Sequence, residues 1–377
     1  MRSTSTLRRS SDRLTWSIVA ASVAACFSAI ALNASFPQLI GASTTSTTST
    51  TSTTTTTTTT TFASAPIVSA RAGWTVASSS QRGVMVQYRN FRIGASTFRA
   101  LLLNARTTLL RWHVGSTDPN LFAKVPMDAG PSIDWRSEGP PGVVAVFNGG
   151  FKQHADAGGS MVDGVNLVPP VRGLMTIALD AAGHWEMGVW GSVGFPTTGF
   201  RVISYRQNLA PLVLRGSLTP AGVSANWALW GSPLNNQPLE PRSGLGVDAQ
   251  GNLIFVATMK GVLQSQVGEA LIKAGAVTGM QLDINPDWPI LGASFTPLHA
   301  GGRFPVQLPY SEHNPSIYET GWTRDFFVAL AEPGNWSCSW SSRGLTGPPG
   351  VSQPQPLSLV GTTCANATTA TTQPPLG

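Results

Sequence analysis

The sequence has little charge and little cysteine. Asp, Glu, Lys and Arg make up 11% of its 377 residues, whereas about a quarter is usual in globular proteins. Its three cysteines, Cys26, Cys338 and Cys364, include no Cys-x-x-Cys pair, which excludes the common zinc and thioredoxin-like motifs. A disulfide between Cys338 and Cys364 would require an oxidising compartment. The sparse charge favours a protein that faces outward or that handles polar neutral ligands.

Several familiar catalytic signatures are also missing. The sequence contains no Gly-x-Ser-x-Gly elbow, no His-Glu-x-x-His helix, no P-loop and no Rossmann glycine fingerprint. Its five histidines are scattered and form no pair at the spacing of metal ligands. No cofactor and no metal site is therefore expected, although the sequence leaves open whether a divalent metal takes part in the chemistry.

Acidic residues are absent from one long stretch. Seven arginines and no Asp or Glu lie between Arg71 and Arg111. Two interpretations stay open: a solvated protein face, and a surface for an anionic partner such as a phosphate-bearing polymer. Nucleic acid is not expected as a partner, because this diffuse bias is its only support.

One long apolar run, residues 14–32, follows the basic residues 1–13. It is close to the minimum length for crossing a hydrocarbon layer of about 30 Å, and the basic residues predict a cytoplasmic N-terminus. Residues 14–36 are therefore interpreted as a membrane anchor or a signal peptide, with a lipid anchor at Cys26 as a third alternative. Each alternative places the rest of the chain outside the cytoplasm, either on the cell membrane as a single-pass protein or secreted.

Composition divides the remainder of the chain into three parts. Residues 37–66 are dominated by Thr and Ser, and they are expected to form a disordered linker. Residues 333–377 are rich in Pro, Gly, Ser and Thr, and they are expected to form a disordered tail. Residues 67–332 remain as one folded domain.

Short apolar runs typical of β-strands dominate this domain. They cover residues 84–88, 100–103, 109–114, 143–147, 174–179, 185–190, 201–205, 245–247, 253–256, 279–283 and 326–330. Two joins place an aspartate, Asp180 or Asp248, three residues before a glycine, which predicts antiparallel hairpins. The expected class is α+β: a mostly antiparallel twisted β-sheet with a few packed helices in a single extracytoplasmic domain.

One segment has the pattern of an amphipathic helix. Apolar residues recur at helical spacing over residues 267–274. Ser265 is the expected N-cap, and Gly275 is the expected end of the helix. This helix follows the expected strand 253–256 and precedes the expected strand 279–283.

A strand that stops in two glycines is the first candidate site. In the segment VVAVFNGGFK, Asn148, Gly149, Gly150 and Phe151 follow the apolar residues of a buried strand. Glycines here allow either a tight turn or the close approach of a ligand to the backbone. Successive amides can turn toward an anion, and Lys152 beside them adds positive charge, so the segment is a candidate phosphate cradle.

The second candidate is the strand end in MQLDINPDWPI. Its prolines prevent a continuing helix, so Asp283 and Asp287 are expected on a kinked loop at the sheet edge. A carboxylate at the rim of a core can act as an acid or base, unless it only caps the turn. Trp288 offers an aromatic face to a sugar ring. A calcium site of Asp283, Asn285 and Asp287 would lack the further oxygen ligands that such sites use.

Two further residues have both a functional and a structural interpretation. Arg242 lies at the entrance of the strand in PRSGLGVDAQG, where an arginine could clamp a phosphodiester by two hydrogen bonds or simply lie at the surface. His113 lies within an expected strand, so it is a candidate to assist catalysis or a half-buried strand residue.

Taken in order, these segments resemble the phosphodiester glycosidase domain family. The resemblance rests on HVGSTDP, VVAVFNGGFK, GVDAQGNLIFVA, the helical residues 267–274, MQLDINPDW and TRDFFVAL, and it covers roughly residues 84–330. Bacterial members of the family are often labelled exopolysaccharide-biosynthesis proteins. Many members continue after the Leu-Asp pair with a glycine-rich tract, whereas this chain continues with INPDW.

The resemblance implies a glycosidase that hydrolyses a sugar-1-phosphodiester in an envelope or extracellular polysaccharide. It implies that Asp283 is the acid or base, that the turn and Arg242 hold phosphate, and that Arg324 belongs to the phosphate clamp or to a structural ion pair. The candidate catalytic residues are Asp283, Lys152 and His113. The candidate substrate-binding residues are Asn148, Gly149, Gly150, Phe151, Arg242, Asn285, Asp287, Trp288 and Arg324.

The altered loop after Asp283 keeps a second hypothesis open. On the same fold, the domain would be a non-catalytic module for glycan binding or exopolysaccharide assembly. Under both hypotheses the expected partner is a carbohydrate or a sugar-phosphate polymer, and the membrane is contacted through the N-terminal segment.

Overall fold

The computed structural model describes residues 68–119, 125–155, 157–332, 336–342 and 359–366. These residues belong to one compact unit. The segment 14–36, Cys26 and the Thr/Ser-rich linker 37–66 lie outside the described residues. In the part of the chain that the structure describes, no helix has the length and apolar character needed to span a membrane.

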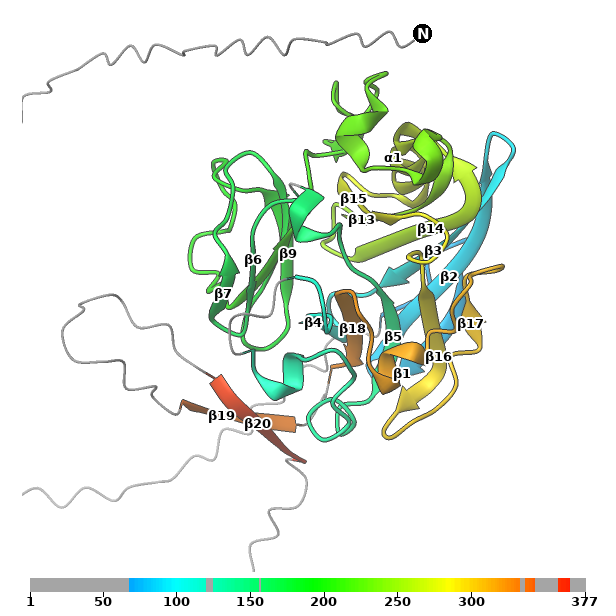
Figure 1. Ribbon diagram of the computed structural model, residues 1–377. Helices are drawn as coiled ribbons and strands as arrows, with labels where there is room; N and C mark the ends of the chain where they lie inside the picture. The colour runs from blue at the N-terminus through cyan, green and yellow to red at the C-terminus, as the bar shows by residue number, and fades with distance from the viewer. Residues whose placement is uncertain (1–67, 120–124, 156, 333–335, 343–358, 367–377) are drawn as a thin grey trace, which may run out of the picture. The chain divides into compact units, whose positions relative to one another are not determined.

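The largest sheet has the strand order β1-β2-β3-β14-β13-β15-β11-β12, and its neighbours pair antiparallel (Figure 1). Its strands are β1 (Thr75–Ser80), β2 (Gly83–Ile93), β3 (Ser96–Leu103), β14 (Leu253–Val262), β13 (Glu240–Val247), β15 (Thr278–Ile284), β11 (Val213–Leu214) and β12 (Ser217–Leu218). Successive residues alternate between two buried faces: Leu101 and Phe255 pack on one, Leu102 and Ile254 on the other. This alternation is the pleat of a sheet covered on both sides.

Two five-stranded sheets pack with it. The first has the order β17-β16-β5-β18-β4 and comprises β17 (Val306–Gln307), β16 (Leu291–Leu298), β5 (Val143–Asn148), β18 (Phe326–Ala331) and β4 (Thr108–His113). The second has the order β7-β6-β10-β8-β9 and comprises β7 (Val165–Val168), β6 (Ser160–Val162), β10 (Ser204–Gln207), β8 (Met175–Leu179) and β9 (Trp185–Val189). Phe147, Ile177 and Phe255, one from each sheet, belong to the same buried cluster. The prediction of a mostly antiparallel α+β domain is confirmed.

Both predicted hairpin turns are present. Asp180 Oδ1 accepts hydrogen bonds from the backbone amides of Ala182, Gly183 and His184, each at 2.9 Å. Between β13 and β14, Asp248 Oδ1 accepts from the amides of Gln250 and Asn252, and Gly251 has the positive φ of 81° that this turn requires. In each turn, the aspartate side chain therefore accepts hydrogen bonds from backbone amides that have no partner on a neighbouring strand.

Helix α1 (Gln264–Ala274) covers one face of the large sheet (Figure 1). It packs closely because glycines lie beneath it: a Cβ on Gly244 would lie 2.6 Å from Val267 Cγ1, and one on Gly279 would lie 2.8 Å from Leu271 Cδ1. Gly275 ends the helix in the left-handed conformation, as predicted. Ser265, however, is not the N-cap.

The N-cap lies two residues earlier than the sequence suggested. Its N-cap is Leu263, whose amide donates to Gln266 Oε1 at 3.1 Å. The side chain of Gln266, at the third helical position, thus accepts from the amide of the N-cap residue. The leucine side chain itself has no polar atom with which to cap the helix. Ser265 lies inside the first turn.

The remaining short elements are α2 (Ile317–Thr320) and the 3-10 turns η1 (Met127–Ala129), η2 (Gln153–Ala155), η3 (Trp227–Trp230) and η4 (Leu234–Asn236). Strands β1, β6, β7, β11, β12, β16 and β17 were not expected from the sequence, and the strand expected at 201–205 is β10, which begins at Ser204. In the tail, where composition predicted disorder, the described residues form an antiparallel pair of strands, β19 (Trp336–Ser342) and β20 (Leu359–Asn366). Their register pairs Cys338 with Cys364.

Strand β5 positions the candidate site. All six of its residues are buried, and it lies between β16 and β18. Its last residue, Asn148, pairs with Phe326, the first residue of β18. The turn after β5 and the residues before β18 therefore lie side by side, although they are distant in the sequence.

Replacing Leu271 by alanine should destabilise the domain. Leu271 is fully buried against the glycines of β13 and β15, so its truncation leaves a cavity that costs about 2–5 kcal/mol of unfolding free energy. Urea denaturation measures the loss. Leu239→Ala is the matched control, because Leu239 is 55% exposed, and it should change stability by less than about 1 kcal/mol. Equal effects in the two variants would contradict the packing described for α1.

Candidate functional site

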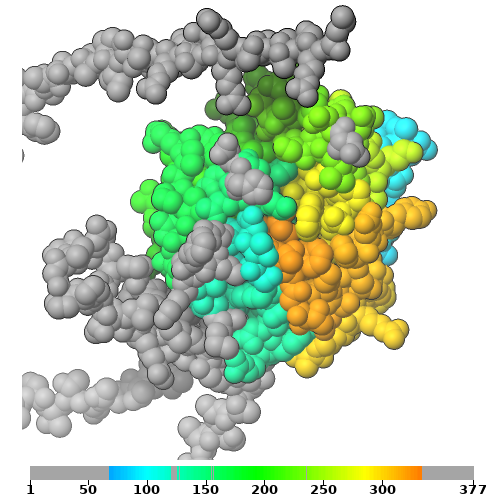
Figure 2. Space-filling model, viewed as in Figure 1, coloured from blue at the N-terminus to red at the C-terminus, as the bar shows by residue number. Residues whose placement is uncertain are grey.

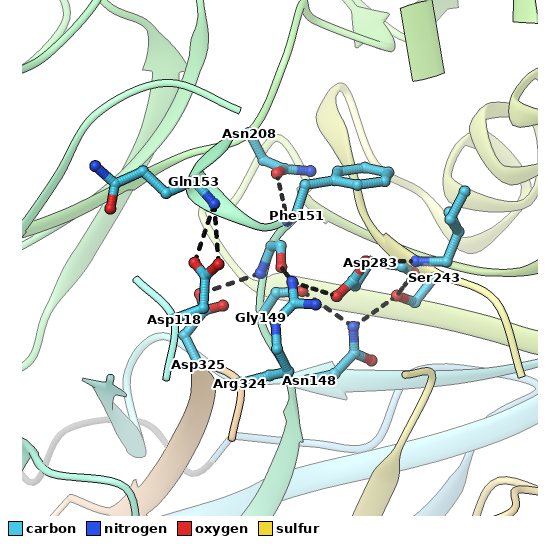
Figure 3. Close-up of polar contacts among 12 residues, drawn as sticks. Asp118, Asn148, Gly149, Phe151, Gln153, Asn208, Ser243, Asp283, Arg324 and Asp325 are labelled. Carbon is cyan, nitrogen blue, oxygen red and sulfur yellow. Dashed lines mark hydrogen bonds and ion pairs between the residues drawn. The ribbon is translucent and has the colours of Figure 1, made fainter. Parts of the chain in front are cut away.

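The candidate site forms where the ends of three strands meet (Figure 3). Asp283 N, near the end of β15, donates to Gly149 O at 3.1 Å, and Gly149 N donates to Asp325 O at 2.9 Å. The paired-glycine turn after β5, the end of β15 and the start of β18 are therefore in direct contact. The two segments that the sequence analysis singled out, around Gly149 and around Asp283, lie in one place.

The amides of the glycine turn are bound by the protein itself. Gly149 N donates to Asp325 O at 2.9 Å, Gly150 N donates to Asp325 Oδ2 at 3.1 Å, and Phe151 N donates to Asn208 Oδ1 at 2.9 Å. The prediction that these amides cradle a phosphate is therefore wrong. The residue must be glycine for another reason: a Cβ on Gly149 would overlap the Asp325 carboxylate and backbone.

One carboxylate organises the interior of the site. Asp325 is 1% exposed, and its Oδ2 accepts hydrogen bonds from Gly150 N at 3.1 Å, Arg206 Nε at 2.8 Å and Trp112 Nε1 at 3.0 Å. Arg206 is equally buried and also donates to Phe151 O at 2.5 Å. Three donors on one oxygen complement a negative charge, so Asp325 and Arg206 form a buried ion pair that holds the glycine turn.

Asn148 ties the turn to the large sheet. Its Nδ2 donates to Gly149 O at 3.0 Å and to Ser243 Oγ, on β13, at 2.9 Å. Ser243 Oγ in turn donates to Asp283 O at 3.0 Å, and Asn148 Oδ1 accepts from Ile290 N at 3.3 Å. Asn148 was predicted to bind substrate. Both the oxygen and the nitrogen of its side-chain amide are instead hydrogen-bonded within the protein, and through Ser243 it helps to fix the backbone of Asp283.

Asp283 is a buried carboxyl group with a shifted pKa. It is 4% exposed, its Oδ1 accepts from Ile284 N at 3.0 Å, and its Oδ2 lies 2.6 Å from Arg324 Nη2. Burial raises the pKa of Asp283 to about 7, and the positive charge of Arg324 opposes this rise without cancelling it. Asp283 can therefore hold or release a proton near neutral pH, which acid–base catalysis requires.

Arg324 connects Asp283 to the surface. Besides the ion pair, its Nη2 donates to Gly150 O at 3.0 Å. Its guanidinium lies over the Trp288 ring, 4.8 Å from the ring centroid, and the exposed Lys152 ammonium lies 5.8 Å from the same ring. Two cations thus lie near the ring of Trp288. This ring packs against the Arg324 guanidinium, a contact that comes in addition to the sugar-binding role predicted for Trp288. Two positive charges therefore lie on this side of the site.

Several buried polar atoms of the site have no hydrogen-bond partner in the described protein. They are Arg324 Nε and Asp325 Oδ1, and the hydroxyl of Tyr318, which is fully buried. Burial and then the charges of Asp325 and Asp283 raise the pKa of Tyr318, so this side chain faces the two carboxylates as a neutral hydroxyl. Unpaired buried polar atoms are uncommon and costly, and their concentration here is typical of a place where a ligand or water binds.

The rim of the site consists of the loop after β15 and its neighbours. Asn285 has a positive φ of 77° and accepts from Leu234 N at 3.3 Å, so it is tied to the neighbouring loop. The side chain of Asp287 is half exposed and lies 3.7 Å from His313 Nε2. Trp322 contacts both Trp288, with ring centroids 6.0 Å apart, and His313, at 4.8 Å.

Residues 322–323 also pack against the segment that follows β4. Ser116 N donates to Trp322 O at 2.9 Å, and Thr117 N donates to Thr323 O at 3.2 Å. In the space-filling view, cyan atoms of the N-terminal part of the domain border orange atoms of its C-terminal part (Figure 2). The resembling segments HVGSTDP and TRDFFVAL are therefore neighbours in the fold.

Two predicted site residues lie away from this arrangement. Arg242 is fully buried on β13 and donates to Val262 O, Trp230 O, Pro238 O and the side chain of Gln281 at 2.8–3.1 Å. These four bonds give Arg242 a structural role, so it is not placed to clamp a phosphate.

His113 is also fully buried. Its Nδ1 lies 2.9 Å from Gly130 O, its Nε2 lies 2.9 Å from Glu138 Oε1, and its ring stacks on Phe326. Both ring nitrogens are thus engaged by the protein, and the structure places His113 in the interior beside β18 rather than next to Asp283. Of the two interpretations of His113, the structure therefore favours that of a strand residue, although the side chain is fully and not half buried.

Sequence analysis missed the residues that hold the site together. They are Asp325, Arg206, Asn208, Trp112 and Tyr318. A signal existed for one of them: Asp325 follows Arg324 directly before the buried run of β18, and two adjacent charges at the start of a core strand are unusual. Arg206 lies within a buried strand, where nothing in the sequence distinguishes it from a surface residue.

No group of three or more His, Cys, Asp or Glu side chains within residues 68–119, 125–155 and 157–332 has the arrangement of a metal site. A small cavity lies next to Trp112, where it is lined by Arg111, Asp128 and Asp163 and not by Asp283.

Replacing Gly149 by alanine should lower stability. The new methyl group would have to displace Asp325, whose backbone oxygen and carboxylate both lie against this position, so we expect a loss of about 1–3 kcal/mol in unfolding free energy. Differential scanning calorimetry measures the shift. Lys152→Ala, an exposed change in the same loop, should leave the melting temperature within the range of neutral surface substitutions. An unchanged Gly149→Ala melting curve would show that the turn does not depend on this contact.

Replacing Asp325 by asparagine should be more damaging still. The variant keeps the shape of the side chain but leaves Arg206 buried without its counter-charge, which costs about 3–5 kcal/mol. Glu269→Gln makes the same carboxylate-to-amide change at an exposed position on α1 and should cost less than about 0.5 kcal/mol. Guanidinium denaturation of both variants tests this, and similar midpoints would refute the importance of the ion pair.

Comparisons with known proteins give a fold likeness only. No protein-family model matches the chain, and no curated protein matches it. Among solved structures, the catalytic domain of zebrafish N-acetylglucosamine-1-phosphodiester alpha-N-acetylglucosaminidase, auto-inhibited by its pro-peptide, is 12% identical with a TM-score of 0.41, covering 69% of this chain and 87% of that one. A hypothetical protein from Synechocystis is also 12% identical, with a TM-score of 0.38, covering 67% of this chain and 63% of that one. These values do not assign the chain to a family.

Proposed function

We propose that this protein hydrolyses a sugar-1-phosphodiester, with Asp283 as its acid. The observation that carries the proposal is the pairing of Asp283 with Arg324: a carboxyl group that titrates near neutral pH lies 2.6 Å from a guanidinium at an electropositive rim. A proton donor beside an anion-binding cation is what the cleavage of a phosphate ester of a sugar needs. The sequence resemblance to phosphodiester glycosidases supports the same reaction.

The residues have distinct roles in this proposal. Arg324 and Lys152 hold the phosphate, because both cations approach Trp288 and Lys152 is open to solvent. Trp288 and Trp322 border the place of the sugar ring. Asn148, Gly149 and Gly150 position Asp283 and Arg324 through their backbone and side-chain contacts, instead of binding the phosphate themselves.

The reaction breaks the bond between the anomeric carbon of the sugar and the bridging oxygen of the phosphodiester. Asp283 donates its proton to that oxygen, so the phosphate leaves as a monoester that still carries one proton. A water molecule adds to the anomeric carbon, and the proton that it releases restores Asp283. The guanidinium of Arg324 balances the negative charge of the leaving group throughout.

The setting of this reaction is part of the proposal. The basic residues 1–13 and the apolar residues 14–36 favour a domain held outside the cytoplasm, and the linker 37–66 would hold it away from the membrane. A sugar-phosphate polymer of the envelope or of an extracellular polysaccharide is therefore the proposed substrate.

The purified full-length protein should release free sugar from glycosyl-1-phosphate methyl diesters. Because Asp283 acts in its protonated form, kcat/KM should fall about tenfold for each pH unit above a pKa of about 7. Sugar release measured by chromatography between pH 5 and 9 gives the profile. Asp283→Asn should abolish release, whereas Glu269→Gln, at an exposed site on α1, should not change it.

Two outcomes would contradict the proposal. Sugar release that persists in Asp283→Asn would remove Asp283 from the chemistry. Binding of the diesters without release by either protein would favour the non-catalytic glycan-binding module.

A further inference from the structure

Three leucines are exposed on one segment of the domain. Leu229, Leu234 and Leu239 are 55%, 51% and 55% exposed, and they belong to residues 216–239, a stretch of the sequence without a charged side chain. This segment lies next to α1 (Figure 1). Single exposed apolar residues are common, whereas several on one surface mark a place of contact with another molecule. The question is therefore whether the three leucines are neighbours.

Arg242 brings the two ends of this part of the chain together. Its Nη1 donates to Trp230 O at 3.0 Å, and its Nη2 donates to Pro238 O at 3.1 Å. The first and the last of the three leucines directly flank these two residues, and the second lies midway between them in the chain. Residues 229–239, which we call the leucine loop, therefore carry all three leucines on one small loop whose ends meet.

The backbone of this segment is held at several points. Trp230 is buried, its Nε1 donates to Ala221 O at 3.1 Å, and its own carbonyl accepts from Gln281 Nε2 at 2.8 Å. Gln264, the first residue of α1, donates to Ser224 O at 3.0 Å. Burial of a leucine side chain is favourable, and the fixed backbone prevents these leucines from turning inward. Their exposure therefore favours a binding role.

The leucine loop borders the candidate site. A Cβ on Gly231 would overlap the ring of Phe151, which ends the glycine turn, and would lie 2.9 Å from Cδ1 of Ile284, which follows Asp283. The loop is also tied to the rim, because the amide of its central leucine donates to Asn285 Oδ1 at 3.3 Å. A molecule that contacts the leucines therefore lies next to the rim of the site.

The charges around the loop suit a surface of anionic headgroups. Lys260 is exposed, and the residue after it packs against Leu239. Glu240 follows Leu239 directly but is only 6% exposed. On the neighbouring loop, the half-exposed Asp287 has His313 as its partner. Apolar side chains with a lysine at their border are typical of protein surfaces that lie on lipid bilayers.

We propose that the leucine loop docks on a lipid bilayer, with its leucines inserted at the boundary between headgroups and acyl chains. This inference rests on the membrane setting of the proposed function and not on the hydrolysis. Residues 14–36 are interpreted as a membrane anchor, and the linker 37–66 would span on the order of 30 Å as a flexible chain. Such a tether keeps the bilayer at a high effective concentration, so a small apolar surface is sufficient for docking.

Other occupants fit this surface less well. A stable interface between two proteins buries roughly 800 Å² on each partner, which three half-exposed leucines on one small loop do not provide. A sugar is bound by hydrogen-bonding groups and by the flat faces of aromatic rings, whereas leucine offers neither. Docking on a bilayer requires only the insertion of a few apolar side chains, and it would hold the rim of the site at the membrane surface.

Photocrosslinking of the full-length protein in lipid vesicles tests the inference. The vesicles consist of phosphatidylethanolamine and phosphatidylglycerol, with a small share of a phospholipid that carries a diazirine near the start of one acyl chain, within the depth of about 5–10 Å that interfacial apolar side chains reach. Trypsin releases the leucine loop within one peptide, residues 216–242, because no Lys or Arg lies between Arg215 and Arg242. Mass spectrometry should find lipid attached to this peptide.

The leucines can be replaced while the tether is kept. The triple variant Leu229→Ser, Leu234→Ser, Leu239→Ser should reduce the lipid attached to peptide 216–242 by about tenfold, because it lacks the side chains whose burial drives docking. Isoleucine at the same three positions keeps the apolar surface and should retain the crosslinks. Since all three positions are exposed, the melting temperature of both variants should stay close to that of the wild type.

A matched control makes the same kind of change elsewhere. The triple variant Val171→Ser, Val193→Ser, Phe295→Ser removes three exposed apolar side chains outside the leucine loop. It should leave the crosslinks of peptide 216–242 unchanged.

Several results would overturn the inference. They are the absence of lipid on peptide 216–242 of the wild type, equal amounts of lipid in the serine variant of the loop, and an equal loss in the control. Light scattering in detergent tests a second copy as the occupant: a dimeric wild type with a monomeric serine variant would assign the surface to self-association instead.

The proposed hydrolysis is measured separately, by sugar release from the soluble methyl diesters. Lipid contact without sugar release would refute the enzyme and leave the docking intact. Sugar release without lipid contact would refute the docking alone.

Discussion

The ion pair between Asp325 and Arg206 is the interaction on which the rest of the site depends. One carboxylate oxygen receives Arg206 from β10, Trp112 from β4 and the amide of Gly150 from the turn after β5. These elements belong to two different sheets. Arg324 precedes Asp325 in the chain, and its partner Gly150 O lies in the turn that Asp325 holds. The positions of Asp283 and Arg324 thus depend on a more deeply buried ion pair.

Much of the fold could be predicted from local patterns, because those patterns were sufficient by themselves. Strand β5 is an unbroken apolar run, and the Asp180 and Asp248 turns satisfy their own amides within a few residues. Strands such as β11, with two residues, or β16, whose second half is partly exposed, carry no such pattern. They exist because a neighbouring strand supplies their hydrogen bonds, and a sequence does not show which neighbour that is.

The sequence singled out two segments that the structure brings into contact, but not the contacts within them. The paired glycines lie against Asp283, as the candidate site requires, whereas the partner of the Gly150 amide lies 175 residues away. The glycines are therefore explained by a buried side chain and not by a ligand. The contacts of Arg242 were missed for a different reason: its partners are mostly backbone carbonyls, those of Trp230, Pro238 and Val262. Every residue carries a carbonyl, so no sequence pattern reveals which of them accept from an arginine.

A carboxyl group that keeps a proton near neutral pH beside an arginine needs an explanation. Burial disfavours the charged form of Asp283, and Arg324 favours it. The pKa of Asp283 stays near 7 because burial outweighs the attraction of Arg324, and because the negative Asp325 lies close by. The same ion pair at an exposed position would hold Asp283 ionised at neutral pH, and burial without the arginine would raise its pKa further. The intermediate arrangement allows the same carboxyl group to exchange a proton and its arginine to bind an anion.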